Sequence, residues 1–238
     1  MIDPLYKIQV QCQVCDHHFE TSRVRPSFRK GVSTDSDFCI HYKDPELNPD
    51  FYVVRVCPRC GYAFSENFSG QWTEAKKQEF HEKVTANWTS KDYGGRRSLE
   101  DAIETYKLAL LSAQIKQESE RVIAGLLHHL AWLYRYQQDD ENERRFLRYA
   151  LESYLKVYEF ESDDINNARL MYLIGELYRR LQQYEEAVKW FSRVVNDQKI
   201  FDSAMIAKSR EQWKLAREEM KRERAGNVRE GNARDENE

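Results

Sequence analysis

The residues whose spacing points most directly to chemistry are the cysteines. All five lie within residues 1–60, and four of them form two CxxC pairs, Cys12/Cys15 and Cys57/Cys60. Two intervening residues allow both sulfurs of a pair to turn toward one point, and two such knuckles can complete a tetrahedron around a metal ion. We therefore predict a four-thiolate metal site formed by Cys12, Cys15, Cys57 and Cys60.

The donor set favours zinc, with iron as the alternative, because tetrahedral sulfur sites accept both ions. A site closed by four protein ligands holds structure, whereas a catalytic zinc keeps one position for water. The Cys57-Pro58-Arg59-Cys60-Gly61 knuckle resembles those of zinc ribbons and of rubredoxins. Four buried thiols or two redox dithiols are the other interpretations, but no βαβ pattern of the thioredoxin type accompanies the pairs.

The residues next to the knuckles also carry expectations. Gly61 and Asp16 each follow the second cysteine of a pair, and both residue types tolerate the positive φ that such a turn requires. We expect Cys39 to be a small buried side chain in a strand beside the site, with a ligand role or a resolving thiol as alternatives. His17 and His18 are expected to be solvated turn residues.

Short strands are expected to lead into both knuckles. Residues 7–11 alternate polar and apolar side chains, and residues 51–56 are β-branched and aromatic. The insert between the pairs is longer than that of a compact ribbon, so it must be folded or make a long excursion. It carries a small basic cluster that could contact phosphate but is more typical of a solvated surface: Arg23, Arg25, Arg29 and Lys30.

From about Glu74 the sequence becomes helical and repeats itself. One unit, residues 168–196, has apolar or small side chains at spacings of three and four on two successive helices. An earlier unit matches both halves, with an insertion around residues 139–145, and a third match is partial. A last charged helix with one apolar stripe is typical of a solenoid cap. The pattern resembles the tetratricopeptide repeat (TPR), with Gly175 allowing close approach of the paired helix.

The TPR resemblance implies a peptide-binding groove lined by the first helix of each repeat. These positions lack the Lys/Asn carboxylate clamp of chaperone-binding repeats, so we expect a peptide with both apolar and acidic groups. The candidate groove residues are His128, Trp132, Arg135, Tyr172, Glu176 and Arg179.

Both halves together resemble the bacterial family catalogued as domain of unknown function 2225. The residues that carry the resemblance are the two knuckles, the Thr34–Cys39 segment and the stretch from Cys57 to Tyr62. The resemblance implies a CxxC…CPxCG module coupled to tetratricopeptide-like helices, and it supplies almost no function.

The composition excludes several classes of protein. The 238 residues have a mean hydropathy of −0.82 and contain no apolar run long enough for a membrane span. The net charge of −3 and pI near 6.1 argue against a generally basic nucleic-acid binder. The start lacks the pattern of a secretory signal, so we expect a cytoplasmic protein. We find no phosphate loop and no nucleophile elbow, and therefore predict that the protein is not an enzyme.

The predicted fold class is α+β, mostly α, with a small zinc-ribbon-like β module followed by an antiparallel, TPR-like helical-repeat solenoid. The predicted domains are residues 1–70, residues 71–225 and a disordered tail at 226–238. The predicted function is a non-enzymatic, zinc-binding scaffold or adaptor for an unknown protein or peptide. The alternatives are a nucleic-acid-associated regulator that uses the ribbon, and a rubredoxin-like iron electron carrier.

Overall fold

The computed structural model describes residues 2–160 and 167–235, with side chains as far as residue 225. It consists of two compact units, residues 1–150 and 151–238, and the division falls within the helix α4 (Asp140–Phe160). Helices predominate and the strands are short antiparallel pairs near the N-terminus, which confirms the α+β, mostly-α class. The predicted division at residue 70 remains a prediction that needs a test on the separate segments.

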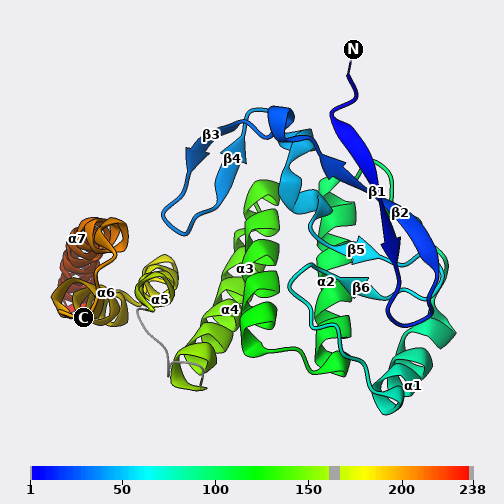
Figure 1. Ribbon diagram of the computed structural model, residues 1–238. Coiled ribbons are helices and arrows are strands. Elements are labelled where there is room, and N and C mark those ends of the chain that lie inside the picture. Colours follow the sequence, from blue (N-terminus) through cyan, green and yellow to red (C-terminus); the bar gives the residue numbers. More distant parts are fainter. Residues whose placement is uncertain (1, 161–166, 236–238) are drawn as a thin grey trace. The chain divides into compact units, whose positions relative to one another are not determined.

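Three separate two-stranded hairpins occupy the N-terminal part of the first unit (Figure 1). They pair β1 (Leu5–Gln11) with β2 (His18–Val24), β3 (Gly31–Thr34) with β4 (Ile40–Tyr42), and β5 (Arg55–Val56) with β6 (Ala63–Phe64). In the first and third hairpins the register ends at Gln11↔His18 and Val56↔Ala63. Each CxxC pair therefore lies in the turn that closes a hairpin.

The strand expected at residues 51–56 is mostly absent, because proline starts a different element there. The 3-10 helix η3 (Pro49–Tyr52) has a proline at its start, and the Asn48 side chain accepts a hydrogen bond from the backbone N–H of Asp50. Only Arg55–Val56 remain as strand. Two further 3-10 helices, η1 (Pro26–Phe28) and η2 (Pro45–Leu47), also begin at prolines, whose fixed φ suits a first helical position.

The helices of the first unit begin at recognisable caps. They are α1 (Glu74–Lys83), α2 (Leu99–Lys116) and α3 (Glu120–Gln137), whereas the short η4 (Thr85–Asn87) follows α1 without a side-chain cap. Ser98 and Asp101 form a reciprocal capping box at α2. Asp139 accepts a hydrogen bond from Asn142 N–H, so the insertion predicted between two helices forms the first turns of α4 instead.

One apolar core joins the β1–β2 and β5–β6 hairpins to α1, α2 and α3 in this unit. Tyr62, in the second knuckle, is fully buried, stacks on Phe64 at 4.8 Å between ring centroids, and meets Phe80 of α1 edge-on at 5.7 Å. Tyr106 of α2 and Leu130 of α3 are also fully buried. The cysteine hairpins are thus packed on helices through aromatic side chains.

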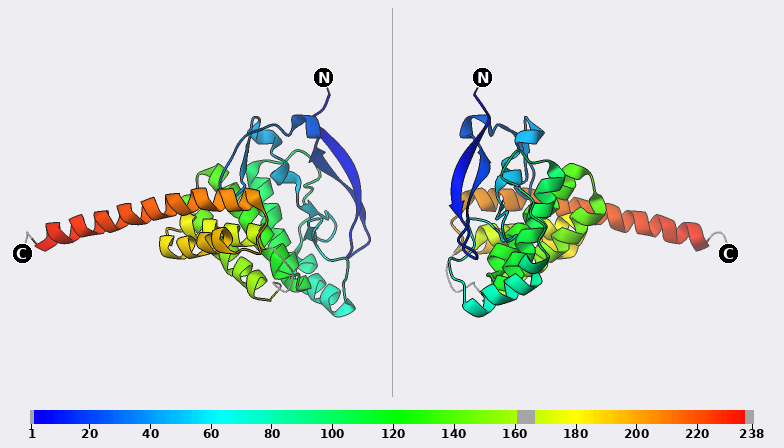
Figure 2. Two further views of the ribbon diagram at one scale, coloured as in Figure 1. Left: turned by 60° about the vertical axis from the view of Figure 1, so that its left-hand side comes forward. Right: turned by 90° about the vertical axis from the view of Figure 1, so that its right-hand side faces the viewer.

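The second unit contains α5 (Ala168–Arg180), α6 (Tyr184–Asn196) and α7 (Ser203–Asp235); α7 is the long helix that leads to the C-terminus in Figure 2. All three pairs of these helices pack together. A Cβ added to Gly175 would lie 2.9 Å from Cε1 of Phe191, so the predicted close approach is confirmed. The apolar positions predicted for this repeat are buried: Met171, Ile174, Ala187, Phe191 and Val194.

Two wider expectations for the helical part have different outcomes. The paired helices are present, and a TPR-like solenoid remains a prediction. The backbone of α7 continues to Asp235, so it includes most of the stretch 226–238 expected to be a tail, while residues 236–238 lie outside the described residues. Among the helices that the structure describes, none combines the length and the apolar character needed to cross a membrane.

Candidate metal centre

The two CxxC pairs come together although the insert separates them in the sequence. Sγ of Cys12 lies 3.6 Å from Sγ of Cys60, and Sγ of Cys15 lies 3.7 Å from Sγ of Cys57. All four sulfurs are within 4.8 Å of one another. A tetrahedron with metal–sulfur bonds of ~2.3 Å has edges of about 3.8 Å. The four thiols therefore have the spacing that a single tetrahedral ion requires.

Both knuckles use the same backbone turn. In the first, Cys12 N–H donates to the carbonyl of His17 and Asp16 N–H donates to the carbonyl of Cys12, at 2.9 and 3.0 Å. In the second, Cys57 N–H donates to Tyr62 and Gly61 N–H donates to Cys57 at the same distances. The two turns differ in sequence but have the same pair of backbone hydrogen bonds, so each presents its two cysteines in the same way.

The predicted left-handed residues are confirmed in both turns. Asp16 has φ +56° and Gly61 has φ +77°. At Gly61 a side chain would also collide with the indole of Trp88, since an added Cβ would lie 2.7 Å from Cδ2. Trp88 Nε1–H donates to the Pro58 carbonyl at 2.9 Å, and the Thr85 hydroxyl donates to the Cys60 carbonyl at 3.1 Å. The segment after α1 thus holds the second knuckle in shape.

Most of the four thiols are buried, and their mutual contacts shift their pKa values. Cys12, Cys57 and Cys60 are buried and Cys15 is partly exposed. The hydrogen bond with Cys57, together with burial, raises the pKa of Cys12 to about 12, while hydrogen bonds from Cys12 and Cys60 lower the pKa of Cys57 to about 2. The same contacts raise the pKa of Cys60 well above its ordinary value. A metal that binds here must displace protons, so its affinity falls as the pH falls.

Arg97 is a structural residue near the site that sequence reasoning missed. Its side chain is buried and donates to the carbonyls of Phe51 and Val54, at 2.8 and 2.7 Å, and to that of Tyr93 at 2.7 Å. Desolvation lowers its pKa to about 10. The guanidinium fixes the irregular chain that leads into the second knuckle, and only its proximity to the start of α2 could have suggested this role.

Cys39 belongs to a different cluster from the other four cysteines. It is fully buried, as expected, and lies just before β4. Its thiol donates to the hydroxyl of Tyr136 at 3.1 Å, and burial raises its pKa to about 12. Among the described residues its metal-ligating neighbours are Asp35 and His41, whereas the four-sulfur cluster contains no histidine. His18 is exposed and His17 is half-buried, and neither belongs to that cluster.

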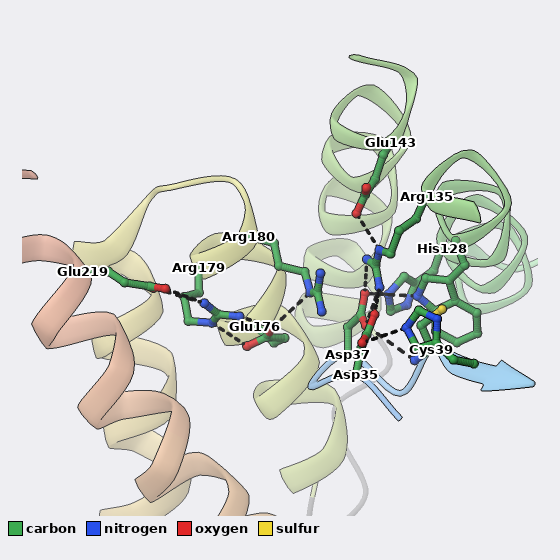
Figure 3. Close-up of polar contacts among 12 residues, drawn as sticks. Asp35, Asp37, Cys39, His128, Arg135, Glu143, Glu176, Arg179, Arg180 and Glu219 are labelled. Atoms are coloured by element: carbon green, nitrogen blue, oxygen red, sulfur yellow. Dashed lines mark hydrogen bonds and ion pairs between the residues drawn. The ribbon is translucent and has the colours of Figure 1, made fainter. Parts of the chain in front are cut away.

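The predicted groove residues on α3 converge on an aspartate of the β3–β4 hairpin. Trp132 Nε1–H donates to Oδ2 of Asp37 at 3.1 Å, and Arg135 donates to both carboxylate oxygens at 2.6 and 3.0 Å. Nε2 of His128 lies 3.5 Å from Asp37 Oδ2. His128, Trp132 and Asp37 are all buried (Figure 3 labels Asp37, His128 and Arg135). On α3 these side chains therefore contact the hairpin loop of the same unit.

The predicted groove residues on α5 are likewise engaged within their own unit. Glu176 is fully buried and accepts from Arg179 at 2.8 and 2.9 Å and from Arg180 at 3.1 Å. Arg179 also donates to Glu219 of α7 at 2.9 Å (Figure 3). Tyr172 is buried against Phe191. Peptide binding by the six predicted groove residues remains a prediction. Contacts between residues far apart in the sequence, such as Arg179 with Glu219, leave no signal in helical spacing.

Three residues of the basic cluster make contacts within the protein, one of them in an ion pair. Arg23 contacts Glu66, Arg25 donates to the carbonyl of Asp3, and Arg29 donates to the carbonyl of Val24. These contacts direct part of the basic surface toward the protein itself and weaken the case for phosphate binding.

The sequence profile of a bacterial family described as "Uncharacterized protein conserved in bacteria (DUF2225)" matches residues 5–216. The match covers most of the chain, so the protein belongs to this family, and the resemblance seen in the knuckles and the Thr34–Cys39 segment is confirmed. A search of curated proteins finds no match.

Proposed function

We propose that this member of the DUF2225 family is a non-enzymatic, zinc-binding interaction scaffold. In this proposal Cys12, Cys15, Cys57 and Cys60 hold one structural Zn²⁺. The observation that carries the proposal is the convergence of four sulfurs from two hairpin turns to within 4.8 Å of one another.

A structural role for the metal is supported by the donor set and by the small size of the hairpins. Four protein sulfurs occupy all four coordination positions of a tetrahedral ion, so no position is left for a substrate. The β5–β6 hairpin has strands of only two residues, too short to be stable alone. Structural zinc contributes ~10–16 kcal/mol to folding at neutral pH, enough to hold such a module.

The scaffold role is supported by the paired helices of the C-terminal unit. α5 and α6 repeat the TPR-like pattern of a small residue facing a buried aromatic side chain, here Gly175 and Phe191. TPR arrays commonly bind proteins or peptides on their helical surfaces.

An iron electron carrier is the second candidate, because four thiolates accept iron as readily as zinc. A nucleic-acid regulator is the third, and predicts binding to DNA or RNA that weakens with salt. The contacts of Arg23 and Arg25 speak against it.

The test is elemental analysis of the native protein combined with affinity capture from its own cells. We expect a colourless protein that contains zinc and co-purifies with a reproducible protein partner. A red, redox-active protein with iron would establish the electron carrier. A folded zinc protein that captures nothing above a Phe191→Ala control, in which the helical unit is loosened, would contradict the scaffold role.

A further inference from the structure

A second group of metal-ligating side chains lies on the β3–β4 hairpin. It consists of Asp35 and Cys39, in the loop between the strands, and His41 in β4. One donor atom from each lies within 4.8 Å of the other two. Oδ1 of Asp35 is 2.9 Å from Nε2 of His41. The three residues follow a D-x3-C-x-H spacing and share no member with the four-sulfur cluster.

We propose that Asp35, Cys39 and His41 form a second metal site, for a divalent transition ion of the zinc class. The set offers one oxygen, one nitrogen and one sulfur, each a normal zinc donor. Mg²⁺ and Ca²⁺ prefer oxygen ligands alone, so the thiol and imidazole select against them. Three protein ligands leave the fourth position of a tetrahedral ion for a ligand from solvent, unlike the closed four-sulfur site.

The loop backbone is bent so that the donors meet. Phe38 has φ +71°, a left-handed conformation that is unusual for a bulky residue. Around it, Asp35 N–H donates to the carbonyl of Cys39 at 2.8 Å, and Phe38 N–H donates to the carbonyl of Asp35 at 2.9 Å. This turn brings Cys39 back toward Asp35. Strained residues of this kind are concentrated at functional sites.

Tyr136 of α3 contacts two of the proposed ligands, and contacts of this kind orient metal ligands in proteins. The Tyr136 hydroxyl lies 3.1 Å from Sγ of Cys39 and donates to the carbonyl of Ile40 at 2.8 Å. Its ring meets the imidazole of His41 edge-on, with centroids 6.0 Å apart. Tyr136 therefore supports both the sulfur and the imidazole.

Arg135 forms an ion pair with Asp35, one of the proposed ligands, through one of the two carboxylate oxygens. Its guanidinium donates to Oδ2 of Asp35 at 2.7 Å, while Oδ1 of the same carboxylate faces His41. The bidentate contact of Arg135 is with Asp37, which is not one of the three ligands (Figure 3). Oδ2 of Asp35 is thus held by Arg135, and Oδ1 is the oxygen that lies next to His41, another of the three proposed ligands.

A cavity adjoins the cluster at His41. It has a volume of about 830 Å³, within the usual range of small-molecule sites, and its lining includes His41, Tyr42, Phe51 and Tyr136. The His41 side chain is 40% exposed, so an ion can reach the imidazole without unfolding the hairpin.

The test is a titration of the metal-free full-length chain with Co²⁺ and with Zn²⁺. We expect two binding events in the parent protein, one with the strong absorption of a four-thiolate site and one with the weaker sulfur absorption of a single thiolate. His41→Gln should remove the second event and leave the first. His81→Gln, which alters an exposed histidine on α1, is the matched control and should retain both.

A titration that shows the four-thiolate event alone in the parent protein would overturn the proposal. It would also be overturned if the second event were retained in both His41→Gln and Asp35→Asn, with circular dichroism confirming that both variants are folded. The Cys57→Ser variant separates this result from the first site, because it should lose the four-thiolate event and keep the one that depends on His41.

Discussion

The cysteine hairpins and the helical unit α5–α7 are stabilised in different ways. The hairpin strands are between two and seven residues long. In two of the turns that join them, the cysteine sulfurs lie within 4.8 Å of one another. The helices α5 and α6 each run for 13 residues and bury a periodic apolar face, with Phe191 seated against Gly175. Short strands cannot build an apolar core of their own, so a bound ion can stabilise them instead. Longer helices with a periodic apolar face bury enough surface to be stable without an ion.

Loss of one ligand sulfur should produce the largest effect. Cys57→Ser is expected to abolish metal binding at the four-sulfur site and so remove most of the ~10–16 kcal/mol that structural zinc contributes. Amide hydrogen exchange should show the β1–β2 and β5–β6 hairpins unprotected while α5–α7 keep their protection. Cys39→Ser is the control, because that sulfur lies outside the cluster; equal protection in both variants would refute the contrast.

The stability of the helical unit should fall when a cavity is made in it and should not depend on the metal. Phe191 is fully buried, so Phe191→Ala should lower the free energy of unfolding of α5–α7 by ~3–5 kcal/mol. Chemical denaturation followed by circular dichroism measures the loss. The zinc content should not change, and a fall in bound zinc would show that the two regions depend on each other.

A smaller effect is expected from Gly61→Ala. The left-handed backbone should cost about 1–2 kcal/mol with any L-residue, and the collision with Trp88 adds to this. We expect a lower midpoint of thermal unfolding and weaker zinc retention in a chelator competition. Gly70→Ala is the matched control, since an added Cβ there meets nothing within 4 Å. Similar behaviour of the two variants would contradict the assigned role of the turn.

The smallest effect should be a pH dependence from His128. Burial lowers its pKa below the ordinary value near 6.5, so the folded state favours the neutral imidazole. The unfolded chain then binds the proton more readily, and stability should fall as the pH drops from about 6.5 toward the lowered pKa. His128→Gln should flatten this part of the stability profile, whereas the exposed His81→Gln should leave it unchanged.

The sequence predicted what depends on local spacing. CxxC spacing led to the four sulfurs, the residue types at positions 16 and 61 to the left-handed turns, and helical periodicity to the contact between Gly175 and Phe191. Each of these follows from a few neighbouring residues, so one sequence is enough to find them.

Contacts between distant segments were not predictable in this way. Helical spacing suggested His128, Trp132 and Arg135 as groove residues, but it did not predict that their side chains meet Asp37, which is far away in the sequence. The role of Arg97 depends on carbonyls of an irregular segment, which have no sequence signature. The cluster of Asp35, Cys39 and His41 forms only after Phe38 turns the loop.

Zinc-edge X-ray absorption spectroscopy of the full-length Cys39→Ser protein tests the central claim most directly, because this variant removes the sulfur of the second cluster and keeps the four-sulfur cluster intact. The account predicts a zinc ion with four sulfur neighbours at ~2.3 Å. A folded protein without zinc, or a zinc ion surrounded mainly by nitrogen and oxygen, would contradict it.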